Sequence, residues 1–337
     1  MKGKVRIVDV AKKAGVSVTT VSQILNGKGS RFSQETQERV RQVRAELGYV
    51  PDFNARNLIV GSAKTIGIII PNIANPFFST FVRGVENAAQ AGNFIPLILS
   101  GDGNPDLERQ YVEQLIQRTV DGLIIASPSV DQATIDHFLK ANQIPYLLID
   151  QNPIDEGDRV STDDFEGAKM AVSHLLALGH KKIAMLSCYN PALNQKQRLE
   201  GYKAQLLEAG LEVNEQLIIE SSLDKKGGYN ASEAVIKTGA SAVFTVNDEM
   251  AIGLYRGLGE HGLKIPTDIS IVGYDNIDLA EYVSPKLTTV SQPVFKMGQV
   301  AFKLLLDRIN NPHAPAQRVK LPVELVIRDS SQRYYGQ

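Results

Sequence analysis

Two kinds of hydrophobic spacing divide the chain. Over residues 5–47, apolar residues recur every three to four positions, which is typical of amphipathic helices. From residue 64 onward, short continuous apolar runs alternate with helical patterns. The runs lie at Thr65–Ile70, Phe94–Leu99, Gly122–Ile125, Pro145–Ile149, Lys182–Leu186, Leu217–Glu220, Ala242–Thr245 and Ile269–Gly273. The helical patterns lie at Phe77–Ala91, Leu107–Arg118, Gln132–Asn142, Phe165–Leu178, Gln195–Ala209, Gly228–Lys237 and Glu249–His261. This alternation predicts parallel sheets covered on both faces, in two similar α/β lobes.

The first 26 residues predict two short helices joined by a tight turn. The apolar stripe of the first helix consists of Val8, Ala11 and Ala14, with Val10 beside it. Gly15 ends this helix, because glycine accepts a left-handed backbone, and Ser17 is placed to cap the next one. The second helix buries Val21, Ile24 and Leu25 and exposes Val18, Thr19, Ser22 and Gln23. We interpret the pair as a helix-turn-helix whose second helix enters a major groove, the alternative being an ordinary helical hairpin.

A third helix and the charge distribution support a nucleic-acid-binding head. Ser33 is a predicted N-cap, and Val40, Val43 and Leu47 have helical spacing before Gly48. Residues 1–60 hold eleven Lys and Arg against five Asp and Glu, whereas the remainder holds 25 against 32. We therefore expect only this basic head to meet phosphates.

Composition argues against several other classes of protein. Cys188 is the one cysteine, so no internal disulfide forms, which fits a reducing cytoplasm. The N-terminus has no apolar signal-peptide region, and no run approaches the length of a membrane span. The five histidines lack metal-ligand spacing, and Ser187 lacks a nucleophile motif. We expect a cytoplasmic protein with no membrane contact, metal, cofactor or catalytic residues.

The head resembles the DNA-binding head of the LacI/GalR repressor family, whose pattern is roughly T-x-x-D-V-A-x-x-A-G-V-S-x-x-T-V-S-x-x-L-N. The matching residues are Asp9, Val10, Ala11, Ala14, Gly15, Val16, Ser17, Thr20, Val21, Ser22, Leu25 and Asn26. The rest of the chain is similar to the periplasmic-binding-protein-like body of that family. In that fold the chain crosses between the lobes three times, here near Val160, Thr289–Gln292 and Leu321.

This resemblance implies the fold class and the domain boundaries. The fold is an all-α helix-turn-helix head with a hinge helix, followed by a two-lobed α/β body with parallel sheets. The head spans residues 1–50, the hinge segment 51–62, and the effector-binding and dimerisation body 63–337. Lobe 1 covers about 63–160 and 293–320, and lobe 2 covers about 161–292 and 321–337.

The resemblance also implies a homodimer on a palindromic operator in double-stranded DNA. The DNA-contacting residues are then Ser17, Val18, Thr19, Thr20, Ser22, Gln23 and Asn26, with Ala55, Arg56, Asn57 and Leu58 in the hinge segment. Leu58 occupies the position of a leucine that wedges between the central base pairs, the alternative being a flexible linker. Most relatives carry arginine at position 23. Because glutamine favours adenine and arginine guanine, we expect operator half-sites that differ at that base pair.

Polar and aromatic side chains lie just past the predicted strands, where α/β folds bind ligands. The set is Asn75, Phe77, Phe78, Asp150, Arg198, Asn247 and Asp275, with Gln292 in the second crossing. Carboxylates and amides pair with hydroxyls, and phenyl rings pack on sugar C–H surfaces, so a neutral polyhydroxylated ligand is expected. A phosphorylated ligand would need more cations than Arg198.

The same set looks like the sugar-contact set of the ribose-binding protein and the ribose repressors. This resemblance implies three kinds of contact with the sugar. Ring hydroxyls are bound by Asp150, Arg198 and Asp275, and amide contacts come from Asn75, Asn247 and Gln292. The sugar ring is sandwiched by Phe77 and Phe78. Gln151 stands where sugar-binding proteins often have arginine, which leaves the exact sugar open. We expect a repressor controlled by ribose or a similar pentose.

Three alternatives remain at this point. A purine-responsive repressor is one, because relatives bind purines. A catabolite-control regulator of the same family, whose partner is a phosphorylated carrier protein, is another. A sugar receptor or enzyme with an accessory head belongs to a different class of protein.

Overall fold

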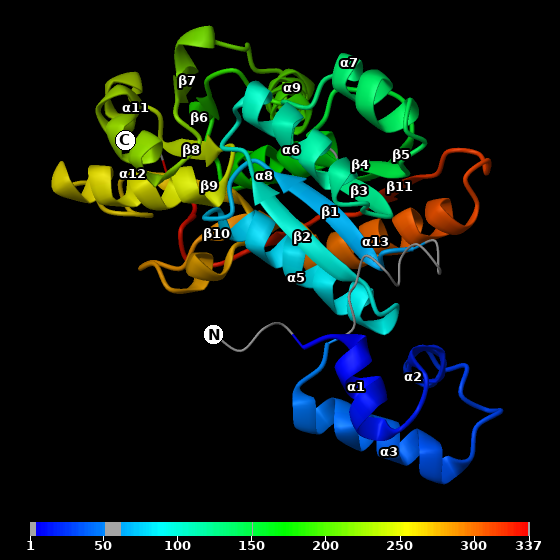
Figure 1. Ribbon diagram of the computed structural model, residues 1–337. Coiled ribbons are helices and arrows are strands. Elements are labelled where there is room, and N and C mark those ends of the chain that lie inside the picture. Colours follow the sequence, from blue (N-terminus) through cyan, green and yellow to red (C-terminus); the bar gives the residue numbers. More distant parts are fainter. Residues whose placement is uncertain (1–4, 51–61, 150, 336–337) are drawn as a thin grey trace. The chain divides into compact units, whose positions relative to one another are not determined.

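The computed structural model describes residues 5–50, 62–149 and 151–335 (Figure 1). The chain divides into two compact units, residues 1–63 and 64–337. The predicted contacts that lie outside the described residues are Ala55, Arg56, Asn57, Leu58 and Asp150. These five positions therefore remain predictions from sequence.

The N-terminal unit is helical, as predicted. Its helices are α1 (Ile7–Ala14), α2 (Val18–Leu25) and α3 (Gln34–Leu47). Gly15 ends α1 with a left-handed backbone (φ 67°), and the Ser17 hydroxyl caps α2 by accepting the amide of Thr20 at 3.0 Å. The turn between the first two helices thus has the local chemistry that the sequence indicates.

The core of this unit corrects one prediction. Its buried apolar side chains are Val10, Ala11, Ala14, Val21, Ile24, Val40, Val43 and Tyr49. Val8, predicted to belong to the apolar stripe, is 55% exposed. At roughly 3.6 residues per turn, positions 10, 11 and 14 share one helix face and position 8 is rotated away from it.

The C-terminal unit contains two six-stranded sheets, ordered β11-β5-β4-β3-β1-β2 and β12-β10-β9-β8-β6-β7. The first sheet consists of β1 (Thr65–Ile70), β2 (Ile95–Ser100), β3 (Gly122–Ile125), β4 (Tyr146–Ile149), β5 (Asp158–Thr162) and β11 (Arg318–Leu321). The second consists of β6 (Ile183–Cys188), β7 (Ile218–Ser221), β8 (Ala242–Thr245), β9 (Ser270–Asp275), β10 (Thr288–Ser291) and β12 (Glu324–Val326). Neighbouring strands are parallel except β10 and β12, which are antiparallel. The predicted parallel sheets are confirmed.

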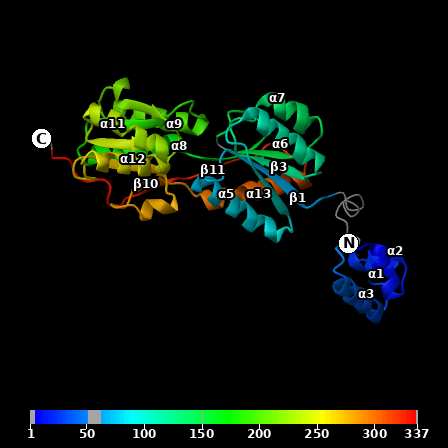
Figure 2. The same cartoon turned by 60° about the vertical axis from the view of Figure 1, so that its left-hand side comes forward.

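Helices cover both sheets. Those of the first sheet are α5 (Pro76–Ala91), α6 (Pro105–Gln117), α7 (Gln132–Thr134) with its π-helical continuation (Ile135–Lys140), and α13 (Val294–Asn310). Those of the second are α8 (Asp164–Ala177), α9 (Leu193–Glu208), α10 (Lys225–Asn230), α11 (Ser232–Thr238) and α12 (Asp248–Glu260), with short 3₁₀ turns at Glu215–Leu217 and Asp278–Glu281. We call the first sheet with its helices lobe 1 and the second lobe 2. Figure 2 shows the two lobes side by side.

The chain passes between the lobes three times. It leaves lobe 1 after β5, returns after β10 to form α13, and crosses again between β11 and β12. The carboxyl ends of the central strands of both lobes therefore face a common space, which is where a two-lobed α/β body binds its ligand.

Some element predictions were wrong in detail. The helix predicted at Gln132–Asn142 is a short α-helix that continues as a π-helix, and the helix predicted at Gly228–Lys237 is two helices, α10 and α11. The apolar-run criterion also missed β5, because this strand buries a charge. Asp158, 2% exposed, binds the guanidinium of Arg308 at 2.7 and 2.9 Å, so its burial is compensated by an ion pair.

Candidate functional site

The helix-turn-helix unit presents the outward face of α2. Val21 and Ile24 are buried and fix how the helix lies on α1 and α3. Val18 is 40% exposed and Thr19 is exposed, so both are accessible to a partner. Within the described head, α2 thus exposes the face that a helix-turn-helix places in a major groove.

The remaining predicted head residues differ in their surroundings. Ser17 and Thr20 share a hydroxyl–hydroxyl hydrogen bond of 2.9 Å at the cap, and the Asn26 amide donates to the Ser22 hydroxyl at 3.4 Å. Gln23 is half-buried, and within the described chain its Oε1 accepts no hydrogen bond. This oxygen is buried, so the side chain would have to turn outward for its amide to reach a base edge.

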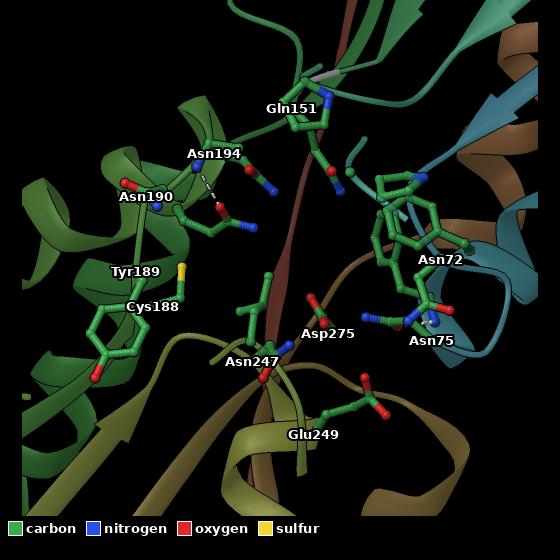
Figure 3. A pocket seen from close by; sticks show the side chains of 18 of the residues that line it. Asn72, Asn75, Gln151, Cys188, Tyr189, Asn190, Asn194, Asn247, Glu249 and Asp275 are labelled. Atoms are coloured by element: carbon green, nitrogen blue, oxygen red, sulfur yellow. Dashed lines mark hydrogen bonds between the residues drawn. The ribbon is translucent and has the colours of Figure 1, made fainter. Parts of the chain in front are cut away.

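A cavity of about 610 Å³ lies between the two lobes of the body (Figure 3). Its polar and aromatic lining comes from Asn72, Asn75, Phe77, Phe78, Asp102 and Gln151 on the lobe-1 side, and from Cys188, Tyr189, Asn190, Asn194, Gln195, Arg198, Asn247, Glu249 and Asp275 on the lobe-2 side. The cavity thus brings together Asn75, Phe77, Phe78, Arg198, Asn247 and Asp275, all of which were predicted to bind the effector. Its volume is in the usual range for small-molecule sites.

The lobe-1 wall is formed by the start of α5. The Oδ1 of Asn75 accepts the amide of Phe77 at 2.9 Å and caps the helix. The rings of Phe77 and Phe78 pack edge to face with their centroids 5.1 Å apart, and both are about 5% exposed. The capping bond leaves the Asn75 Nδ2 as a donor beside the two rings. Because the rings contact each other edge to face, a sugar ring does not fit between them in this arrangement, so the predicted sandwich is not formed.

The lobe-2 wall is organised by Arg198, which is 3% exposed. Its Nε donates to Asp164 at 2.8 Å, and its Nη1 donates to the carbonyl of Val246 at 2.7 Å. Nη1 also lies 3.5 Å from Asp275, and the guanidinium lies 3.7 Å above the ring of Tyr274. Sequence reasoning missed Asp164 and Tyr274, although Asp164 stands at the start of the helix that follows the first crossing.

Burial and neighbouring charges shift the pKa values in this cluster. Burial raises the pKa of the Asp275 carboxyl to about 7, and the charge of Arg198 opposes the rise. Burial also raises the pKa of Asp164, again opposed by Arg198. Burial alone would lower the pKa of Arg198, but Asp164 and Asp275 raise it, so the guanidinium stays charged.

Gln292 lies behind the cavity and not in its lining. Its Nε2 donates to Asp275 at 2.7 Å, and its Oε1 accepts the hydroxyl of Thr162 at 2.9 Å. Gln292 therefore positions Asp275 and joins it to the first crossing strand. Asp275 itself has a φ of 113°, a backbone conformation that side chains rarely adopt and that is often found at ligand sites.

The start of α12 supplies the remaining polar groups. Asn247 caps the helix by accepting the amide of Met250 at 2.9 Å, which leaves its Nδ2 as a donor. The carboxylate of Glu249 is 8% exposed and pairs with Lys225. The fully buried Asp248 accepts the Thr289 hydroxyl at 2.6 Å and the Ile277 amide at 2.9 Å, and burial raises its pKa well above the ordinary value.

Other kinds of site find no support in the described residues. Within residues 5–50, 62–149 and 151–335, no group of three His, Cys, Asp or Glu side chains is arranged to hold a metal ion. The helices of these same ranges include none that is long and apolar enough to cross a membrane. Cys188 lines the cavity as a buried thiol, and burial raises its pKa to about 11, so it is not a reactive thiolate.

A helix-turn-helix unit joined to a two-lobed body with an interlobe cavity defines a DNA-binding regulator controlled by a small molecule. The profile of bacterial regulatory proteins of the LacI family matches residues 6–52. The profile of periplasmic binding proteins and the sugar-binding domain of the LacI family matches residues 63–329.

Relatives and solved structures agree with these matches. The chain is 34% identical over 327 residues to the HTH-type transcriptional repressor PurR of Photobacterium profundum, covering 96% of this chain and 98% of that protein. A LacI family transcriptional regulator from Enterococcus faecium, solved with bound ribose, is 42% identical and covers 80% of this chain and 99% of its own, with a TM-score of 0.76. The lac repressor dimer bound to operator and the anti-inducer ONPF is 29% identical, covering 98% of this chain and all of its own (100%), with a TM-score of 0.85.

The chain belongs to the LacI family of bacterial transcriptional repressors. It is therefore a DNA-binding transcriptional regulator. The predicted family is confirmed, and so is the fold class except for the hinge helix, whose residues lie outside the described ranges.

Proposed function

We propose that the effector is ribose or a similar pentose, bound between the lobes. The observation that carries this proposal is the cavity itself, which gathers Asn75, Phe77, Phe78, Arg198, Asn247 and Asp275 from separate strand ends. The Enterococcus faecium regulator with bound ribose, at 42% identity, supports the same class of ligand. In this proposal Arg198 and Asp275 bind ring hydroxyls, and the two phenyl rings pack on the ring.

The charges around the cavity favour a neutral sugar over a sugar phosphate. Asp102, Glu249 and Asp275 line it together with one arginine, Arg198. Arg198 is already paired with Asp164 and Asp275. A phosphate would lie beside these carboxylates with no unpaired arginine to bind it, whereas hydroxyls can donate to carboxylates and accept from Arg198 and from the amides.

We infer that effector and operator binding are reciprocally coupled. A ligand that prefers one lobe arrangement shifts the affinity for DNA, typically by about 1–3 kcal/mol, and DNA shifts the affinity for the ligand by the same factor. Because a DNA-binding regulator of this family acts where its operator lies, we infer that the protein acts in the cytoplasm. The sugar would then report the availability of a carbon source directly to the promoter.

For DNA we propose direct base contacts from Val18, Thr19 and Gln23, with Leu58 as the wedge in the minor groove. A binding-site selection with wild type and Gln23→Arg tests the base contact. Adenine at the contacted position for wild type and guanine for Gln23→Arg is the expected result. Guanine with both proteins would refute the assignment of Gln23.

The effector is tested by thermal melting of the full chain with pentoses, hexoses, sugar phosphates, guanine and hypoxanthine. A ligand at 100 times its Kd adds about 2.7 kcal/mol of stability, which shifts Tm measurably. A shift with ribose that Asp275→Asn abolishes and the exposed control Asp278→Asn retains would support the proposal. Operator release, measured with the same sugar, then gives the sign of the coupling.

A purine effector is the second candidate, favoured by the PurR relative at 34% identity. A shift with guanine or hypoxanthine and none with any pentose would replace ribose by a purine. No shift with any small molecule would instead favour control by a phosphorylated carrier protein.

A further inference from the structure

The lobe-2 wall of the cavity carries an amide that the sequence pattern did not indicate. Asn194, at the start of α9, is 3% exposed and lines the cavity, and its side-chain amide points into it (Figure 3). Among the described residues its Oδ1 is buried and accepts no hydrogen bond. A buried carbonyl oxygen without a donor is unfavourable, so such a group at a ligand cavity indicates that a donor arrives with the ligand.

Asn194 differs from four of the other amides around the cavity in what its oxygen does. Gln151 and Asn190 also line the cavity, but their oxygens are not among the buried atoms that lack a partner. The side-chain oxygens of Asn72, Asn75, Gln195 and Asn247 accept backbone amides at 2.6–2.9 Å. Those four side chains are held by their own loops and helix ends, and one of the two lone pairs of each oxygen is already used. No such bond commits the oxygen of Asn194, so both ends of this amide can serve a ligand.

We propose that Asn194 is a specificity-determining contact that binds two adjacent hydroxyls of the effector. A carboxamide presents a donor and an acceptor side by side, which matches hydroxyls on neighbouring carbons. Its terminal torsion has broad minima, so the amide can turn both atoms toward the ligand. The inference rests on the proposed function, because it takes the effector to be a polyhydroxylated sugar.

The position of Asn194 relative to Arg198 explains why a second contact is needed on this wall. The two residues lie one turn apart on α9, and Arg198 is held by Asp164, Val246 and Asp275. A guanidinium held in this way has few N–H groups left for a sugar, and it cannot accept a hydrogen bond from a sugar hydroxyl. An amide that accepts and donates can distinguish a hydroxyl from its epimer, which a cation alone does poorly.

Titration calorimetry on the full chain tests the assignment with ribose, 2-deoxyribose, arabinose and xylose. Wild type should prefer ribose over at least one analogue by roughly tenfold or more, because that analogue leaves the amide unpaired. Asn194→Leu should weaken ribose roughly tenfold and remove this preference. Asn194→Asp keeps the shape and the acceptor but lacks the donor, and should lose part of the preference. If Asn194→Leu does not fold, Asn194→Asp alone tests the assignment.

The control is Asn214→Ala. Asn214 likewise stands at a helix start and accepts the amide of Gln216 at 2.9 Å, but it lies outside the cavity, so the sugar affinities should not change. A uniform loss for all four sugars in both Asn194 variants would overturn the assignment, as would no loss at all. If wild type binds pentoses and the ratios of the four sugar affinities are the same in the Asn194 variants, only the role assigned to Asn194 is refuted. If wild type binds no pentose, the proposed function fails and this assignment fails with it.

Discussion

The hydroxyl of Thr162 donates to the Oε1 of Gln292 at 2.9 Å, and both side chains are buried. Thr162 ends β5 at the first crossing between the lobes, and Gln292 follows β10 at the second. The Nε2 of Gln292 in turn donates to Asp275 in the cavity. One chain of hydrogen bonds therefore joins two crossing strands to a proposed effector contact. We expect this chain to contribute to coupling between the ligand and lobe movement.

Thr162→Val should weaken this coupling while preserving the shape of the side chain. Gln292 would keep its bond to Asp275 but lose a buried partner, so we expect a loss of about 1–2 kcal/mol in the free energy of unfolding. We also expect a smaller change of operator affinity on adding effector. Operator titrations with and without effector measure this change. Thr238→Val, whose hydroxyl donates to Val235 away from the crossings, is the control. An unchanged coupling in Thr162→Val would show that the bond is only structural.

Asp164→Asn should destabilise the body by about 3 kcal/mol and weaken effector binding, because it leaves the buried Arg198 partly uncompensated. Urea unfolding measures the first effect and calorimetry the second. Glu260→Gln breaks the exposed pair with Arg256, which should cost less than about 1 kcal/mol.

The paired variant Asp164→Leu with Arg198→Met separates the two roles of this ion pair. Replacing both charges by apolar groups should recover part of the stability, because neither member of the pair is left alone, although Asp275 loses the cation beside it. Effector binding should remain lost, because Arg198 lines the cavity. Recovery of binding in the paired variant would contradict the role proposed for Arg198.

Gly84→Ala should destabilise lobe 1 by about 3 kcal/mol, since overpacking a close helix crossing forces backbone shifts. A Cβ at Gly84 would lie 2.1 Å from the carbonyl of Phe295, and one at Gly298 would lie 2.2 Å from the carbonyl of Phe81. α5 and α13 therefore pack backbone to backbone. Gly259→Ala, on an open face of α12 with nothing within 4 Å of the added Cβ, should be neutral or stabilising by about 0.5–1 kcal/mol. Thermal unfolding compares the two, and equal effects would contradict this packing argument.

Acid should destabilise lobe 2 through His180. Its Nδ1 is 2.9 Å from the hydroxyl of Ser241, its Nε2 is 3.1 Å from the carbonyl of Gln332, and its ring stacks on Tyr334. Burial lowers the pKa of His180 below the ordinary value of 6.5. Between the lowered pKa and 6.5 the unfolded chain binds more protons than the native one, so stability falls as pH drops below 6.5.

Asp275, whose pKa burial raises to about 7, binds its proton more readily in the native state and therefore opposes this loss over the same pH range. Urea unfolding at about pH 7.5 and about pH 5 therefore reads the His180 contribution as the difference between wild type and His180→Gln. Burial, followed by the charge of His180, also lowers the pKa of His174, so His180→Gln should remove part of the fall and not all of it. His313→Gln, on an exposed loop, should retain the wild-type fall. A fall of the same size in His180→Gln would assign the acid sensitivity to other groups.

Local chemistry and burial could be predicted from the order of the residues alone. The left-handed Gly15, the Ser17 cap and the alternation of strands and helices all follow from neighbouring residues, and they were predicted correctly. The residues just past the strands were also found, because the carboxyl ends of parallel strands meet at one edge of a sheet. Hydrophobic spacing, however, reports only whether a position is buried, so it missed β5, whose buried Asp158 is compensated by the distant Arg308.

The pairing of polar groups, in contrast, became visible only in the folded chain. Arg198 meets Asp164 and Asp275 although 34 and 77 residues separate them in sequence, and Thr162 meets Gln292 across 130 residues. These contacts placed Gln292 behind the cavity and left the oxygen of Asn194 without a donor among the described residues. Which polar side chains pair with one another depends on where the strand ends of both lobes lie in space. No local sequence pattern determines these positions.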